Sequence, residues 1–446
     1  MATRPRVLYI THRVPHPPDK GDRIRNYHVL RELAKGARIT LVGLADEPVT
    51  EATTAELLRL CETVEIIPAS GKRRWLRAGR SLLTGGSLSE GLFEEPKLDA
   101  ALARLATEGG WDASLVSASS LAPYLQRHGL PAKPRFVDLV DVDSQKWFDY
   151  ADAASGPKNM LYTLEGHRVR RLEQWIAEWA AGVFIVSPAE CAVFDGFTRT
   201  LSAPSPGFAG ESWGEGLVSQ NPSPPAPLPQ SRERGGVFVA RLGAGTVATN
   251  GVDLDYFQPR PDVEPVRACA FVGALDYPPN IDGAVWFARD IWPAIRTRHS
   301  EAEFWIVGRN PTPAVRRLGS IPGVKVAGAV PDVRPHIAKA ALAVCPIRIA
   351  RGLQNKVLEA MAMAKPTLAA PAAIRALKAV PGEHLLSPTT EEEWIAAVGD
   401  LFDDPVRQRQ LGAAARSFVE THHHWDRCLQ PLVRAILDSA VPPVPA

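Results

Sequence analysis

The residues best suited to chemistry lie in a segment that leads from a predicted strand, through a Gly-containing loop, into a helix. Arg348, Arg351 and Lys356 bring three positive charges to this segment, and the hydrophobic pattern predicts a helix over Lys356–Ala364. The first turn of a helix offers free N–H groups and the positive end of the helix dipole, which suit a diphosphate. Because ligands of open α/β sheets bind at the carboxyl ends of strands, this segment is a candidate anion site.

Glu359 lies one turn into the same predicted helix. At that place its carboxylate can accept hydrogen bonds from the hydroxyl groups of a ribose. The same carboxylate also complements the helix dipole, in which case the neighbouring cations are simply solvated. From the residues alone both roles stay open.

Three aspartates follow another predicted strand, Arg135–Leu139. Asp138, Asp141 and Asp143 alternate along the apparent end of this strand, which predicts that they share a face. A carboxylate at that edge suits the deprotonation of a hydroxyl group or the stabilisation of developing positive charge. Capping and hydrogen bonding in the following turn are the competing roles, and we favour Asp141 and Asp143 over Asp138 for chemistry.

A third candidate is the Pro-rich loop Thr11–Arg25, which follows the predicted strand Val7–Ile10. Gly21 in this loop permits close approach of the backbone to a ligand. The cations of the loop suit a donor phosphate or an anionic acceptor, and they are His12, Arg13, Lys20 and Arg23. A surface turn with solvated cations is the alternative interpretation.

The order of predicted elements indicates how these segments are positioned. Strand and helix patterns alternate through both halves of the 446 residues, which is typical of an α/β protein with two doubly wound, Rossmann-like parallel sheets. We predict an N-terminal domain over 1–200, a Pro-, Gly- and Ser-rich insertion and linker over 201–247, a C-terminal domain over 248–420, and a crossover helix and tail over 421–446.

The segment Lys72–Arg80 has five cations in nine residues, with Trp75 and Leu76 among them. A basic amphipathic segment of this kind can lie on an anionic membrane surface. A solvated helix face is the alternative.

Composition and missing motifs disfavour several classes of protein. The 51 Lys and Arg residues against 49 Asp and Glu residues give a net charge of +2, too balanced for a nucleic-acid binder held by phosphate contacts. The five cysteines are scattered, so we expect neither a metal site nor a disulfide framework. No Gly-x-Gly-x-x-Gly follows either first strand, which disfavours a dehydrogenase. Without an apolar leader or a membrane-spanning stretch, we expect a cytoplasmic protein, at most peripheral on the inner face of the membrane.

The segment Arg348–Pro366 resembles the donor-site motif of the family-4 retaining glycosyltransferases, which have the GT-B fold. Glu359 matches the second Glu of that motif, which binds the ribose of the nucleotide. Arg351 stands where the first Glu of the motif contacts the donor sugar. Phe271–Asp276 and Ile306–Gly308 are similar to the first two strands of the family's donor domain.

The resemblance implies two Rossmann-like domains that face a cleft, with a nucleotide-diphosphate sugar bound as the donor in the C-terminal domain and no cofactor. On this interpretation the donor-binding residues are Gly273, Gly308, Arg351, Gly352, Asn355 and Glu359. The catalytic residues are Arg348, Lys356, Asp141 and Asp143.

Two positions depart from the family pattern. Many members hold the donor pyrophosphate with an Arg just after the Gly of the first strand and a Lys a few residues later. Here these places are occupied by Ala274 and by Pro279 or Asn280. We predict that the nearest cations in the sequence supply the charge instead, namely Arg348, Arg351 and Lys356.

The segments Leu8–Arg25 and Asp138–Trp147 resemble a subgroup of sugar transferases associated with exosortase (PEP-CTERM) and exopolysaccharide systems. Asn250–Phe257 resembles the family's segment before the second domain, and His424–Arg434 resembles its closing helix, which crosses back to the first domain. The resemblance implies sugar transfer, with retention and without a metal, to a saccharide or polyprenyl-diphosphate-linked acceptor. The alternatives are a sugar-nucleotide epimerase of the same fold and a non-catalytic nucleotide-sugar-binding assembly protein.

Overall fold

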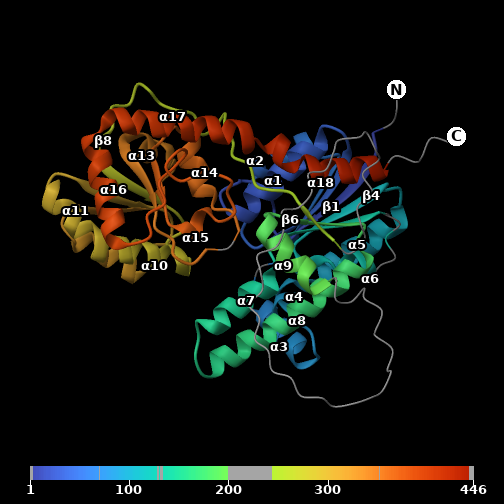
Figure 1. Cartoon of the computed structure of the whole chain (residues 1–446). Coiled ribbons are helices and arrows are strands. Elements are labelled where there is room, and N and C mark those ends of the chain that lie inside the picture. The colour runs from blue at the N-terminus through green and yellow to red at the C-terminus, as the bar shows by residue number, and fades with distance from the viewer. Residues whose placement is uncertain are drawn as a thin grey trace, which may run out of the picture.

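Two α/β domains make up the chain, each built around one parallel sheet (Figure 1). The computed structural model describes residues 4–69, 71–127, 130, 134–198, 244–350 and 352–440. Most of the insertion predicted within 201–247, and Arg351 in the candidate donor loop, lie outside the described residues.

Seven parallel strands form the N-terminal sheet, in the order β3-β2-β1-β4-β5-β6-β7. They are β1 (Arg6–Thr11), β2 (Arg38–Ala45), β3 (Thr63–Pro68), β4 (Ala113–Ser117), β5 (Arg135–Val140), β6 (Gly182–Ile185) and β7 (Gly245–Val247). β7 pairs with β6, so the last residues of the predicted linker complete the first sheet. The central strand β1 is buried from Val7 to Thr11 because helices cover both faces of the sheet.

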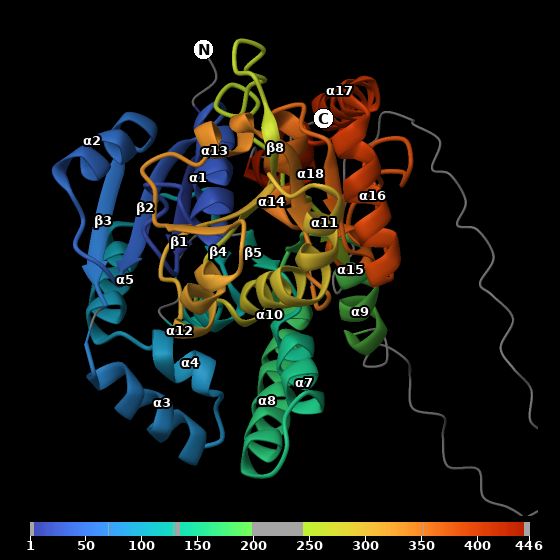
Figure 2. The same ribbon diagram turned by 90° about the vertical axis from the view of Figure 1, so that its left-hand side faces the viewer.

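Nine α-helices accompany this sheet in the described part of the N-terminal domain. They are α1 (Gly21–Ala34), α2 (Glu51–Leu60), α3 (Arg73–Leu83), α4 (Leu88–Phe93), α5 (Pro96–Glu108), α6 (Tyr124–Arg127), α7 (Asp143–Asp152), α8 (Pro157–Trp179) and α9 (Pro188–Thr198). In both views α3, α7 and α8 project from the end of the domain that lies farthest from α17 (Figures 1 and 2).

The C-terminal sheet is also parallel and has five strands in the order β10-β9-β8-β11-β12. They are β8 (Val266–Val272), β9 (Glu303–Val307), β10 (Val324–Gly328), β11 (Ala340–Cys345) and β12 (Thr367–Ala369). Its helices are α10 (Pro278–Trp286), α11 (Trp292–Arg298), α12 (Pro313–Arg316), α13 (Arg334–Lys339), α14 (Asn355–Ala362), α15 (Pro371–Ile374), α16 (Glu391–Asp403) and α17 (Pro405–His422). The two parallel sheets confirm the predicted fold class.

The amphipathic pattern of Asn280–Arg298 predicts one helix, but the helix is interrupted in the structure. A π-helical turn over Phe287–Ile291 separates α10 from α11. Pro293 lies in the first turn of α11, where it has no N–H to donate, and the altered hydrogen-bond spacing before it accommodates the ring.

The last helix, α18 (Trp425–Ala440), crosses from the C-terminal domain to the N-terminal domain (Figure 1). Its residues Leu429, Leu432 and Ile436 belong to the same apolar cluster as Val29 and Leu33 of α1. This packing confirms the predicted crossover helix. None of the described helices is both long enough and apolar enough to cross a bilayer.

Candidate active site between the two domains

The helix predicted to bind the donor is α14, which begins at Asn355 directly after the loop that follows β11. Lys356, in its first turn, extends toward the loop after β8, and Lys356 Nζ donates a hydrogen bond to Asn280 Oδ1 at 2.8 Å. Asn280 Nδ2 in turn donates to the carbonyl of Ala274 at 2.8 Å. Lys356 therefore lies beside the two positions at which the family pattern has its cations.

Burial lowers the pKa of Lys356, while Cys345 and Glu359 oppose this shift. Glu359 lies one turn further along α14, and burial raises its pKa to about 7 although Lys356 acts against the shift. Within the described chain no donor is hydrogen-bonded to the Glu359 carboxylate. A mostly buried carboxylate without a partner is energetically costly, which is the pattern expected where a ligand supplies the missing donors.

The two glycines predicted to bind the donor contact each other. A Cβ added to Gly308 would lie 1.7 Å from the carbonyl oxygen of Gly273, and Gly308 has a φ of +154°. Only glycine fits there, because the chain after β9 passes against the chain after β8. A Cβ at Gly273 would meet the Asn280 amide at 2.8 Å and the Lys356 side chain at 3.4 Å, so Gly273 leaves room for this lysine.

Arg348, predicted to be catalytic, is held within the C-terminal domain. Its Nη2 lies 2.9 Å and 3.0 Å from the two carboxylate oxygens of Asp282, and its guanidinium lies over the Trp286 ring at 4.9 Å. Arg351 lies outside the described residues. Of the two predicted cations that the structure describes, Arg348 and Lys356, only Lys356 reaches the loop after β8.

Asp141, from the N-terminal domain, meets the donor loop across the domain boundary. A Cβ added to Gly352 would lie 2.5 Å from Asp141 Oδ1, and Gly352 has a φ of +63°. Asp141 Oδ1 is buried without a hydrogen-bond partner among the described residues. Burial raises the pKa of Asp141, Lys146 opposes this shift, and the carboxylates of Glu190 and Asp143 add to it. The structure therefore brings together two segments that lie about 200 residues apart in the sequence.

Local backbone geometry directs Asp141 toward the cleft. Val140, the last residue of β5, has a φ of +67°, which is rare and strained for a β-branched residue. The turn that follows is closed by a hydrogen bond from the Asp141 N–H to the Leu139 carbonyl at 2.9 Å. Strain of this kind is concentrated at functional sites, where the surrounding structure maintains it.

The prediction that Asp138, Asp141 and Asp143 share one face is wrong. Asp138 lies inside the sheet, fully buried and paired with Arg25, whereas Asp141 is in the turn and Asp143 is the first residue of α7. The strand ends at Val140, so the alternation of side chains stops before the second aspartate. Asp138 is held by Arg25, and the preference for Asp141 and Asp143 as the groups that do chemistry stays a prediction.

Asp143 is part of a small charged cluster that sequence reasoning missed. Its Oδ2 accepts a hydrogen bond from Ser119 Oγ at 3.3 Å, and Lys146 Nζ lies 3.3 Å from its Oδ1. Asp143 raises the pKa of Lys146, burial lowers it, and Asp141 adds to the rise to a lesser extent. The sequence did carry a signal for this pair, because two residues three positions apart on a helix, such as Asp143 and Lys146, lie side by side.

Tyr277, in the loop after β8, faces the same cluster from the other domain. Burial raises its pKa to about 12, and the neighbouring Tyr150 adds to the shift. Lys146 therefore interacts electrostatically with Asp141 and Asp143 of its own domain and with Tyr277 of the C-terminal domain. Nothing in the order of residues indicated this contact, because α7 and the loop after β8 are far apart in the sequence.

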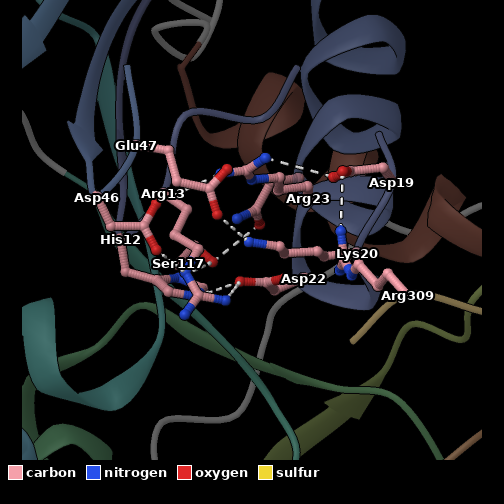
Figure 3. Close-up of polar contacts among 11 residues, drawn as sticks. His12, Arg13, Asp19, Lys20, Asp22, Arg23, Asp46, Glu47, Ser117 and Arg309 are labelled. Atoms are coloured by element: carbon pink, nitrogen blue, oxygen red, sulfur yellow. Dashed lines mark hydrogen bonds and ion pairs between the residues drawn. The ribbon is translucent and has the colours of Figure 1, made fainter. Parts of the chain in front are cut away.

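The cations of the β1–α1 loop are already paired (Figure 3). Arg13 Nη1 lies 2.9 Å from Asp22, and its Nε lies 3.0 Å from Asp46. His12 Nε2 lies 3.1 Å from the same Asp22 oxygen. Burial of Asp22 is outweighed by these neighbours, which hold the pKa of its carboxyl well below the usual range.

The residues that follow, up to the first turn of α1, are paired in the same way (Figure 3). Arg23 lies 3.3 Å from each of Asp19, Asp46 and Glu47, and Lys20 pairs with Glu47. Arg309, after β9 of the C-terminal domain, reaches across to Asp19 at 3.0 Å. The carboxylates balance the cations, so this cluster has little net charge to attract a phosphate. A Cβ at Gly21 would meet nothing within 4 Å, so no protein contact requires a glycine there.

A cavity of about 330 Å³ lies between the domains. Ser187, Glu190 and Val193 line it from the N-terminal domain, and Arg348, Gly352 and Ala376 line it from the C-terminal domain. Because Gly352 also contacts Asp141, the cavity adjoins the point where the donor loop meets the N-terminal domain. No three His, Cys, Asp or Glu residues in the described ranges are grouped so that they could hold a metal ion.

The basic segment Lys72–Arg80 forms most of α3. Three large apolar side chains of this helix are exposed, with Trp75 at 62%, Leu76 at 75% and Leu83 at 89%. The helix is tied to α8 through Arg168, whose Nη1 donates to the carbonyl of Leu82 in α3 and to the carbonyl of Gly86 just after it.

Residues 267–404 match the family model of glycosyl transferases group 1, which covers most of the C-terminal domain. Solved structures resemble nearly the whole chain. Sucrose-phosphate synthase from Thermosynechococcus elongatus is 15% identical, with 96% of this chain and 97% of that chain covered and a TM-score of 0.62. The chain has the GT-B fold.

Two further GT-B structures extend this comparison. HepE from Anabaena in complex with UDP-glucose is 14% identical over 96% of this chain and 98% of that chain, with a TM-score of 0.59. A variant of S. aureus TarM in complex with fondaparinux, α-GlcNAc-glycerol and UDP is 8% identical over 97% and 99% of the two chains, with a TM-score of 0.62. No curated protein sequence matches the chain.

Proposed function

We propose that this GT-B protein is a retaining, family-4 glycosyltransferase that moves a sugar from a nucleotide-diphosphate donor to a saccharide or lipid-linked acceptor. The observation that carries the proposal is the meeting of Asp141 Oδ1, buried without a hydrogen-bond partner among the described residues, with the Gly352 loop directly before the helix that bears Lys356 and Glu359. A reacting sugar between these groups would have a carboxylate on one side and a diphosphate site on the other.

The donor would bind to the C-terminal domain through α14. Its diphosphate would take hydrogen bonds from the free N–H groups of the first turn and from Lys356, which already lies beside Asn280. Glu359 would accept hydrogen bonds from the ribose hydroxyls, which would supply donors to a carboxylate that has none among the described residues. UDP in HepE and TarM supports a nucleotide donor of this type.

Catalysis would depend on stabilising the diphosphate as it departs. A preorganised ammonium and helix N-terminus aimed at the developing charge contribute several kcal/mol in enzymes that use such groups. Asp141 would stabilise positive charge at the sugar carbon, and Lys146 would fix the carboxylates of Asp141 and Asp143 in place. No step of this scheme uses a metal.

A lipid-linked acceptor in an exopolysaccharide system would require the enzyme to work at the inner face of a membrane. The exposed Trp75, Leu76 and Leu83 among the cations of α3 suit insertion into an anionic lipid surface. Neutralising Arg73, Arg74 and Arg80 should abolish salt-sensitive binding to vesicles that contain phosphatidylglycerol, while the same changes leave thermal stability intact.

The proposed function is tested by a thermal-shift screen with nucleotide sugars, followed by a transfer assay. A ligand present at 100 times its Kd stabilises the folded state by about 2.7 kcal/mol, so a binding donor is readily detected. Transfer to an acceptor with the anomeric configuration kept supports the proposal. Binding without transfer or hydrolysis across a panel of acceptors would indicate a non-catalytic binder, and conversion of the donor sugar alone would indicate an epimerase.

A further inference from the structure

A fully buried arginine lies where four of the segments singled out in the sequence meet. Arg25, on α1, donates from Nε and Nη2 to the two carboxylate oxygens of Asp138 on β5, each at 2.8 Å. Arg25 Nη1 donates to the Ala248 carbonyl at 2.8 Å and to Asn250 Oδ1 at 2.9 Å. Four of the five N–H groups of this guanidinium are therefore in use, which fixes its plane.

Asn250 continues the network into the C-terminal domain. Its Nδ2 donates to Asn355 Oδ1 at 3.2 Å, and Asn355 is the first residue of α14. Asn250 is only 6% exposed, and its carbonyl lies 3.1 Å from His423 Nδ1. An unbroken chain of hydrogen bonds thus runs from β5, through Arg25 and Asn250, to the start of the helix that bears Lys356 and Glu359.

Asn250 occupies a special place in the chain connectivity. It follows β7, the last strand of the N-terminal sheet, and precedes the C-terminal domain. The return connection passes beside it, since Val252 and His424 form a β-bridge and the Val252 N–H donates to the His423 carbonyl at 2.8 Å. Both connections between the domains are therefore joined at this point.

The buried network differs from a second polar contact between the domains, the ion pair of Arg309 with Asp19. The pair between Arg309 and Asp19 is partly exposed, so water and salt weaken it. Arg25 and Asp138 have no exposed side-chain surface, and breaking their pair would leave an uncompensated charge in a medium of low dielectric constant. A contact of that strength can hold Asn250, and through it Asn355, in one place.

We propose that Arg25 and Asn250 are positioning residues that fix the start of α14 relative to the N-terminal face of the cleft. They touch neither donor nor acceptor. They act through Asn355, so that Lys356 and Glu359 on α14 face Asp141 on the other domain. This inference rests on the proposed function, in which α14 is the donor helix.

The test removes the bond between Asn250 and Asn355 from either side. Asn250→Ala and Asn355→Ala each delete it, and Asn355→Ala leaves the contacts of Arg25 with Asp138 and Asn250 untouched. Asn159→Ala is the matched control, because Asn159 also donates a side-chain hydrogen bond, to the Ala151 carbonyl at 2.7 Å, but within one domain.

The first measurement is the distance distribution between spin labels on the two domains. Leu58 and Val406, 52% and 55% exposed, are replaced by cysteine and labelled, and the five native cysteines are all buried. We expect both asparagine variants to broaden the distribution, the double variant to broaden it no more than the wider single variant, and Asn159→Ala to leave it unchanged. Unchanged distributions in both single variants would overturn the proposal.

The second measurement compares the effect of the substitution on kcat with its effect on the Kd for UDP. This measurement uses Asn250→Ala, because Asn355 is itself one of the predicted donor-binding residues. Misplacement of α14 in Asn250→Ala should lower kcat about tenfold or more, while the Kd for UDP stays within about threefold of the parent. A loss of UDP affinity with kcat retained would contradict a positioning role. If the parent protein turns over no nucleotide sugar, the proposed function fails, and the label distances still decide whether Arg25 and Asn250 fix the domains.

Discussion

Glu359 gives the most demanding test of the candidate donor site, because its environment links stability to pH. Burial raises the pKa of its carboxyl from the usual 4.5 to about 7, so the folded protein holds a proton that the unfolded chain releases. Stability is then full below about pH 4.5, falls as the pH rises through the window up to about 7, and is constant above it. Replacing Glu359 with Gln removes this loss, since the amide stays neutral at every pH.

The magnitude follows from the displacement of the pKa. Each unit corresponds to about 1.4 kcal/mol, so we expect Glu359→Gln to raise the free energy of unfolding by about 1 kcal/mol at pH 5 and about 3 kcal/mol at pH 8. The same variant should lose affinity for UDP at pH 8, because an amide is a weaker acceptor than a carboxylate for ribose hydroxyls. A residue that weakens the fold yet strengthens binding is the signature of a functional site.

Urea unfolding at pH 5 and pH 8, followed by far-UV circular dichroism, measures the stability difference. Glu264→Gln is the control, because Glu264 is exposed and should show no difference between the two pH values. UDP titration calorimetry over pH 5 to 8 should show affinity rising more steeply with pH in the parent than in Glu359→Gln, because the terminal phosphate of UDP also loses a proton near pH 6 in both titrations. A stability gain that is equal at both pH values, or absent at pH 8, would refute the argument from burial.

Three further predictions follow from the same geometry. Lys356→Met keeps an unbranched side chain of nearly the same length without its charge, and the single-turnover transfer rate should fall about 100-fold or more; an unchanged rate would mean that the diphosphate is held elsewhere. Gly352→Ala puts a Cβ 2.5 Å from Asp141 Oδ1 at a positive φ, so kcat should fall steeply, and parental kcat would show that the two segments separate during turnover. Asp138→Asn leaves the buried Arg25 charge uncompensated and should destabilise the fold by about 3–5 kcal/mol in urea unfolding; a loss below about 1 kcal/mol would show that water reaches the pair.

Much of the fold could be predicted from the order of residues because each element carries a local signal. β1 and β11 are continuous apolar runs, as buried parallel strands require, and α14 follows a Gly-containing loop with a helical pattern. The break at Phe287–Ile291 and the short strand β7 escaped prediction. A three-residue strand has no periodicity of its own, and it exists here because β6 offers an unpaired edge.

The candidate site divides in the same way. Lys356, Glu359, Asp141 and Asp143 could be singled out by residue type and by their places after predicted strands or within the first turn of a helix. The sequence could not predict whether a charged side chain is free or paired, because pairing depends on residues that folding brings close together. Arg348 is held by Asp282, and the cations of the β1–α1 loop are matched by carboxylates that follow β2 or lie on α1.

The sequence by itself determined two doubly wound domains and a set of segments with distinct chemical character. Local patterns suffice for that, since burial periodicity and turn residues act over a few positions. The tertiary structure alone decided which of those segments meet. Asp138 in one domain joins Asn355 in the other through Arg25 and Asn250. Such contacts span more than 100 residues of chain, and only the packing of both sheets and the crossover helix brings their polar atoms within hydrogen-bonding distance.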